Sequence, residues 1–145
     1  MKKWISLLLV IIIVCAVFYL TLQNAEETNA LTYQTMEVLE KIGLNIRYKP
    51  LRHYIHYFEY FVVGLLISNL LLNYIWKCPK AIWISMLFGV VVGTIDEVIK
   101  IWLPIREFDL GDLTRDYVGT IVGVLISAGV SMTIKKVKND NTFES

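Results

Sequence analysis

The chain has 145 residues, of which 56% are hydrophobic and 19% are charged, and its formal net charge is +1. A net charge so close to zero excludes the basic field of a nucleic-acid-binding protein, and the hydrophobic content is high for a soluble domain. The two cysteines, Cys15 and Cys78, have neither the spacing of a metal site nor that of a disulfide framework.

The first region, residues 1–22, carries an apolar run from Trp4 to Leu22 behind the basic pair Lys2 and Lys3. A run of this length spans the hydrocarbon core of a bilayer as a helix. A basic start and an apolar run also describe a secretory signal peptide, but no convincing small-x-small cleavage site follows here. We therefore expect a retained membrane helix.

The second region, residues 23–50, is the longest polar segment of the chain. Apolar residues recur in it at helical spacing, at Met36, Leu39, Ile42 and Ile46. This pattern predicts a short amphipathic helix, which either lies on the outer leaflet or packs over the mouth of the bundle. Gly43 and Pro50 are natural helix breakers and close the region.

The third region, residues 51–134, contains three further apolar runs, at about 54–76, 81–103 and 117–134, and a tail follows at 135–145. Each run is long enough to cross a membrane. The fold class predicted is an all-α membrane protein, a bundle of four transmembrane helices with a short outer amphipathic helix.

Basic residues near the helix ends predict the orientation. The bare count of Lys and Arg is equal on the two sides, but the positive-inside rule weighs short loops and helix ends. The residues assigned to the inside are Lys2, Lys3, Lys77, Lys80, Lys135, Lys136 and Lys138. Both termini are therefore expected in the cytoplasm.

With this topology, ionisable residues of three segments fall at one depth near the outer end. Glu59 lies about 8 Å below the outer end of the second span, and Glu97 about 9 Å below the end of the third, at roughly 1.5 Å per residue. Together with two flanking arginines these residues form a candidate polar pocket, named here the charged layer: Arg52, His53, His56, Glu59, Asp96, Glu97, Lys100, Arg106, Asp112 and Asp116.

Helical phase places this layer inside the bundle. Small residues mark the faces on which membrane helices approach closely. The faces of Glu97 and Asp116 carry such residues, and the expected packing glycines are Gly64, Gly89, Gly93, Gly119 and Gly123. Lys100 follows Asp96 and Glu97 at i+4 and i+3, so it can neutralise one of them.

The pattern resembles the VanZ-like family of small bacterial membrane proteins over roughly residues 28–130. One motif reads Arg52, His56, Phe58, Glu59, Tyr60 and Gly64, and a second reads Asp96-Glu97, Pro104-x-Arg106, Asp112, Asp116, Gly119 and Gly123. Lys100 and Ile105 stand where the family often has glutamine and glycine. The resemblance implies a multi-pass protein of the bacterial cytoplasmic membrane, linked to teicoplanin-type glycopeptide resistance or to a general role in the cell envelope.

Three functions remain open. The first is binding of membrane lipid, of a lipid-linked cell-wall precursor or of the lipoglycopeptide itself at the outer face. The second is an enzyme acting on a lipid or polyprenyl-linked headgroup, in which Glu59, Glu97, Asp112 and Asp116 serve as acid/base or metal groups. The third is a small transporter, although transporter charges usually lie nearer the midplane.

Two further readings concern the charged layer itself. Its carboxylates can be purely structural, paired with Lys100, Arg106, Arg115 or a charged histidine. A metal site from His53, His56, Glu59 and Glu97 has no specific spacing, and His56, Glu59 and Glu97 are its best set. We expect no cofactor.

Overall fold

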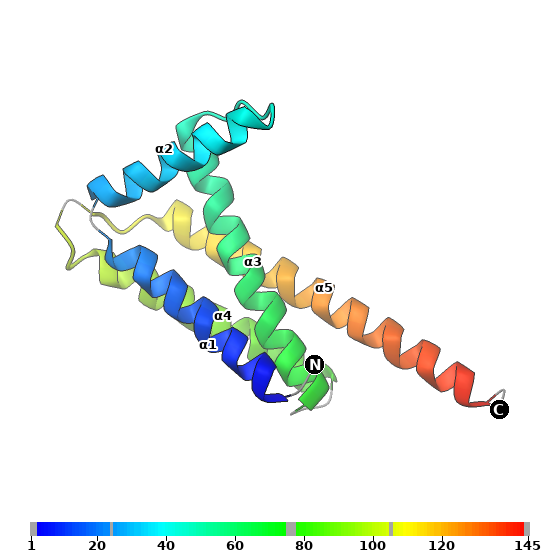
Figure 1. Cartoon of the computed structure of the whole chain (residues 1–145). Helices are drawn as coiled ribbons and strands as arrows, with labels where there is room; N and C mark the ends of the chain where they lie inside the picture. The colour runs from blue at the N-terminus through cyan, green and yellow to red at the C-terminus, as the bar shows by residue number, and fades with distance from the viewer. Residues whose placement is uncertain (1–2, 24, 75–77, 105, 144–145) are drawn as a thin grey trace.

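The computed structural model describes residues 3–23, 25–74, 78–104 and 106–143. Lys2, Lys77 and Ile105, which the sequence analysis singled out, lie outside these residues. The described chain is all-α, in five helices: α1 (Lys3–Leu22), α2 (Ala25–Lys41), α3 (Tyr48–Tyr74), α4 (Cys78–Lys100) and α5 (Leu110–Phe143) (Figure 1). Four of them, α1, α3, α4 and the Leu110–Lys135 part of α5, are long and apolar enough to cross a membrane. The predicted class, a membrane bundle of four spanning helices, is confirmed.

The helices begin earlier than the apolar runs because their first turns are polar. α3 begins at Tyr48, and Pro50 falls in its first turn, where the missing N–H has no intrahelical role. α5 begins at Leu110 because Asp109 caps it. The Asp109 Oδ1 accepts the Gly111 N–H at 2.7 Å, and the Asp109 carbonyl accepts the Leu113 N–H at 3.0 Å.

Figure 1 shows which ends of the spanning helices lie on the same side of the bundle. α1 and α4 run from the side of the bundle away from α2 towards α2, whereas α3 and α5 run back. The end of α1, the start of α3, the loop after α4 and the start of α5 therefore gather at one end, named here the α2 end. The C-terminal half of α5 extends beyond the other helices on the opposite side.

Glycines set the contact between α3 and α5, the most extensive in the bundle. A Cβ atom added at Gly64 would overlap the backbone oxygen of Thr120, and one at Gly123 would overlap that of Phe61. At Gly119 the obstacle is the backbone oxygen of Tyr57. The two backbones approach so closely that only hydrogen side chains fit between them.

The second pair of predicted packing glycines lies on α4. An added Cβ at Gly89 would overlap the side chain of Thr120, and one at Gly93 would lie 3.3 Å from atoms of both Asp116 and Tyr60. α4 therefore presents its glycine face to α5 and α3. This places the next turn of that face, which carries Glu97, against the same two helices.

α2 covers the α2 end, and Gly43 caps it just after its last residue, Lys41. Gly43 has a φ of +86°, and the Leu44 N–H bonds the Leu39 carbonyl at 2.9 Å across it, the pattern of a Schellman cap. Ile42 therefore follows the helix instead of continuing its apolar face, and it is exposed. α2 also exposes the apolar side chain of Val38, as expected of a helix at a membrane surface.

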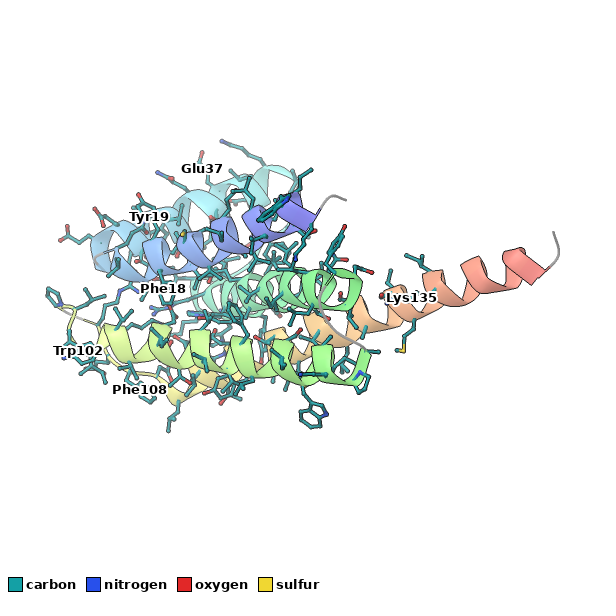
Figure 2. The ribbon with its side chains drawn as sticks, turned by 90° about the horizontal axis from the view of Figure 1, so that it is seen from below. Phe18, Tyr19, Glu37, Trp102, Phe108 and Lys135 are labelled. Carbon is teal, nitrogen blue, oxygen red and sulfur yellow. The ribbon has the colours of Figure 1, made fainter. Side chains whose placement is uncertain are left out.

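Exposed tryptophans mark both ends of the spanning region. Trp4 and Trp83 lie near the starts of α1 and α4. Trp102 follows α4 at the α2 end, where Figure 2 labels it. Tryptophan is enriched at the two membrane–water interfaces. Their positions agree with a bundle that crosses a bilayer with the α2 end at one surface.

Candidate functional site

The charged layer lies at the α2 end, where α3, α4 and α5 meet. Its members differ in exposure. Five are buried, namely Asp96, Glu97, Lys100, Asp112 and Asp116, and five are half-buried, namely Arg52, His53, His56, Glu59 and Arg106. Burial of this many ionisable groups requires that they pair with one another or with a ligand.

The imidazole of His56 lies between two aspartates of α5. Its Nδ1 is 3.1 Å from Asp116 Oδ1, and its Nε2 is 3.5 Å from Asp112 Oδ2. Asp112 and Asp116 are one helical turn apart, so a single ring reaches both. Asp112 also accepts a hydrogen bond from Arg115 Nη1 at 2.5 Å, and Arg52 Nη2 lies 3.8 Å from its other oxygen.

A second group of contacts forms around the acids of α4. Lys100 Nζ donates to Glu97 Oε1 and lies 3.6 Å from Asp96 Oδ2, as its spacing predicted. The other Glu97 oxygen accepts the backbone N–H of Asp109 at 3.1 Å. The Thr21 hydroxyl of α1 hydrogen-bonds Asp96 Oδ1. The acids of α4 thus connect α1, α4 and the loop before α5.

Glu59 and His53, two members of the predicted layer, take part in neither group of contacts. Glu59 is an i+3 neighbour of His56, yet His56 contacts α5 instead. Within the described part of the chain, Glu59 and His53 form no hydrogen bond or ion pair. His53 faces a polar cavity and Glu59 a more apolar one.

The side chains whose potential metal-ligand atoms lie close together are not the set that the sequence predicted. One ligand atom each from His56, Glu97 and Asp116 lie within 4.8 Å of one another. Glu59, which the sequence analysis preferred, is not a member, and Asp116 stands in its place. One imidazole nitrogen and two carboxylates from three helices are a donor set that divalent metal ions accept.

Two adjoining cavities open at the layer. The larger has a volume of about 760 Å³ and is polar, and it is lined by Thr28, Asn29, Tyr48, Lys49, Arg52, His53, Lys100, Arg106, Glu107, Phe108, Asp109 and Asp112. The smaller, of about 230 Å³, is largely apolar, and it is lined by Val17, Leu20, Thr21, Gln23, Thr28, Leu31, Thr32, Thr35, Arg52, Ile55, His56, Glu59, Asp96, Lys100 and Arg106. Both cavities are lined by Thr28, Arg52, Lys100 and Arg106. The two cavities therefore meet at a surface with three basic residues, named here the basic wall.

Arg106 lies on this wall, in the loop outside the spanning helices. Its Nη2 donates to the Thr28 hydroxyl of α2. Burial, and after it the like charge of Arg52, lowers the pKa of Arg106 below its usual range. Two guanidinium groups that repel one another beside a cavity favour an anion between them.

Sequence reasoning missed several polar neighbours of the layer. Thr21 and Thr28 come from α1 and α2, and Asp109 from the loop. The fully buried hydroxyl of Tyr60 is unpartnered in the described residues. Thr21 had a weak signal, because it is a polar residue in the last turn of the first apolar run, at the depth of the layer.

The chain matches a known protein family. A family model described as VanZ/LLP1 matches residues 6–132. This range begins in α1 and ends in α5, so it includes the first helix and every member of the charged layer. No curated protein and no solved structure matches the chain.

Proposed function

The chain belongs to the VanZ/LLP1 family, and on this premise we propose that it binds the headgroup of a lipid-linked or lipidated ligand at the outer face of the bacterial cytoplasmic membrane. The ligand is a lipid-linked cell-wall precursor or a teicoplanin-type lipoglycopeptide. Binding there contributes to lipoglycopeptide resistance or to envelope homeostasis.

The observation that carries the proposal is the junction of the two cavities. The polar cavity has the size of a small-molecule site, and the apolar cavity continues from it between α1, α2 and α3. A ligand with a polar headgroup and a hydrocarbon chain fits this arrangement, with the headgroup in the polar cavity and the chain in the apolar one. A purely structural set of ion pairs needs no cavity of either kind.

The basic wall supports an anionic headgroup. Arg52 and Arg106 line both cavities and Lys49 lines the polar one. Arg52 has Asp112 3.8 Å away, and Arg106 donates to a neutral hydroxyl. Guanidinium groups with such partners can still form bidentate contacts with phosphate or carboxylate oxygens of a ligand.

The lysines support the outward orientation of the layer. Lys3, Lys80 and Lys135 belong to the helix ends on the side away from α2. The positive-inside rule favours a cytoplasmic position for that side, and we propose on this ground that the α2 end faces outward. There it would meet the headgroups of the outer leaflet, the surface at which the proposed ligand binds.

A direct test uses the purified chain in detergent, titrated with a polyprenyl monophosphate and, separately, with teicoplanin. We expect saturable binding to at least one of them. Arg106→Gln should weaken it by about tenfold or more, the effect of losing roughly 1.4 kcal/mol of binding free energy. Lys41→Gln is the control, because Lys41 is exposed on α2 and pairs with Glu37 of the same helix, at 2.8 Å.

Equal affinity in the two variants, or no saturable binding of either probe, would contradict the proposal. The junction would then be a surface feature without a ligand of this class. Normal binding by Lys41→Gln together with weakened binding by Arg106→Gln would show that the loss of affinity comes from the basic wall and not from the change in net charge.

A second candidate function is an enzyme acting on a lipid-linked headgroup. It is favoured by His56, whose ring lies between Asp112 and Asp116, since an imidazole oriented by a carboxylate can transfer protons. Membrane lipid extracts incubated with the protein distinguish the two. A new lipid product that disappears in His56→Gln supports the enzyme, and binding without turnover supports the binder.

A further inference from the structure

We propose that His56, Glu97 and Asp116 bind one divalent metal ion, of the zinc or manganese class, inside the helix bundle. This site is a separate inference from the ligand-binding function, because it concerns the metal content of the chain itself. Each residue comes from a different spanning helix, α3, α4 and α5.

The distances are close to those of a formed site. Donor atoms that share one ion at about 2.1 Å lie at most about 4.2 Å apart. The three donor atoms here lie within 4.8 Å of one another. Three donors of a tetrahedral ion lie about 3.4 Å apart, so movements of less than about 1 Å by each side chain, the scale of rotations about χ angles, bring them into coordination distance.

An unsatisfied oxygen is the second, independent observation. Asp116 is completely buried, and its Oδ2 finds no hydrogen-bond partner anywhere in the described chain. The buried hydroxyl of Tyr60 is unpartnered in the same way, and Tyr60 and Asp116 flank the same glycine, Gly93. Buried polar atoms are almost always paired, and an ion held by Asp116 would supply the missing partner.

The balance of buried charge points to a cation. Among the described residues, the buried Asp, Glu, Lys, Arg and His side chains are four acids and one base, namely Asp96, Glu97, Asp112, Asp116 and Lys100. Asp112 has Arg115 and Arg52 beside it, Lys100 is shared by Asp96 and Glu97, and Asp116 has the imidazole of His56. One ammonium group shared by two carboxylates leaves excess negative charge around Glu97 and Asp116, which a divalent ion between them would balance.

Lys100 is the competitor for this position. Its ammonium contacts Glu97 Oε1, but Asp96 Oδ2, 3.6 Å away, is a second acceptor for the same group. Glu97 is therefore not the only partner of Lys100. Removing this positive charge should strengthen metal binding, whereas it should only weaken a set of purely structural ion pairs.

The donor set and its surroundings select the ion class. One imidazole with two carboxylates suits zinc or manganese better than calcium or magnesium, which prefer all-oxygen sites. Asp112 Oδ2 lies 3.5 Å from the Nε2 of His56 and can orient the ring through it. His56 also lines the apolar cavity, together with Lys100, which gives an ion a path of entry.

The experiment measures metal in the purified full-length chain. The protein is isolated in detergent without chelator, and its metal content is determined by inductively coupled plasma mass spectrometry. A chelator-stripped sample is then titrated with Zn²⁺, Mn²⁺ and the spectroscopic probe Co²⁺. We expect one ion per chain and a visible Co²⁺ absorption band that Zn²⁺ displaces.

Matched variants locate the ion. His56→Gln and Asp116→Asn should lose it, whereas His53→Gln and Glu59→Gln, which lie in the same layer outside the donor set, should keep it. Asp112→Asn should weaken binding by about 10- to 100-fold, the usual effect of losing an orienting group. Lys100→Gln should bind more tightly than the wild type.

Each outcome decides the proposal. A wild type without stoichiometric metal and without a Co²⁺ band overturns it, whatever the variants do. Equal loss of metal in the His53→Gln control also overturns this donor set. If His56→Gln and Asp116→Asn fail to give a monodisperse helical protein, the Lys100→Gln affinity decides, and weaker binding there rejects the site.

Discussion

The Nδ1 of His56 on α3 lies 3.1 Å from Oδ1 of Asp116 on α5, although the two residues are 60 positions apart in the sequence. This contact joins the histidine motif of the second spanning helix to the aspartate motif of the fourth. The ring therefore pairs with α5, and it forms no hydrogen bond or ion pair with Glu59, its i+3 neighbour on the same helix. The functional predictions depend on whether this pairing serves only the packing of the helices.

The first prediction separates a working layer from a structural one. If Asp116 only balances His56, Asp116→Asn breaks a buried pair, which costs about 3 to 5 kcal/mol, and the amount of protein in the membrane should fall. We expect near-normal abundance with loss of teicoplanin protection in a sensitive strain, because asparagine keeps the size and part of the hydrogen bonding.

The control for this experiment is Glu40→Gln, an exposed acid on α2. It should change neither abundance nor protection. Full protection by Asp116→Asn would reject a functional role for the layer, and low abundance of that variant would favour the structural role.

The second prediction concerns the crossing of α3 and α5. Gly123→Ala places a Cβ against the Phe61 backbone, which cannot move aside as a flexible side chain would. The variant should lose about 1 to 3 kcal/mol of stability, the usual cost of overpacking. Thermal unfolding in detergent measures the loss.

Gly129 supplies the matched control on the same helix. An added Cβ there meets nothing within 4 Å. Gly129→Ala should therefore leave the melting temperature unchanged or raise it, because alanine is the better helix former by about 1 kcal/mol. Equal melting temperatures for the Gly123 and Gly129 variants would show that the two helices do not cross at this point.

The third prediction concerns the end of α2. Gly43 has a positive φ of 86° with open space around it, so an added methyl group strains the backbone without a steric clash. Gly43→Ala should cost about 1 to 2 kcal/mol, and Gly43→Asn less. Faster hydrogen exchange of the last turn of α2, with unchanged exchange in α3, is the expected measurement.

The fourth prediction concerns orientation. In a variant without Cys15 and Cys78, single cysteines are placed at Glu107, beside the polar cavity, and at Lys80, near the start of α4. A membrane-impermeant thiol reagent added to intact cells should label position 107 and not position 80. Labelling of position 80 alone would mean that the charged layer faces the cytoplasm, and this would contradict an outer-leaflet ligand.

Sequence alone predicted the features that depend on one helix at a time. The lengths of the four apolar runs identified the spanning helices, because a bilayer demands about 20 apolar residues in each. The contacts of Lys100 with Asp96 and Glu97 followed from the i+4 and i+3 spacing, since helical geometry places such residues on one face. The common depth of the ionisable residues followed from the same rise per residue.

Only the tertiary structure decided which residues of different helices meet. The direction in which a side chain points depends on the rotation of its helix, and that rotation is set by the close contacts at Gly64, Gly119 and Gly123. This is why His56 meets Asp116 and not Glu59, and why the possible donor atoms gather without Glu59. Thr21 and Asp109 joined the layer because α1 and the loop before α5 fold over its end, and helical spacing in the sequence carries no information about contacts between separate segments.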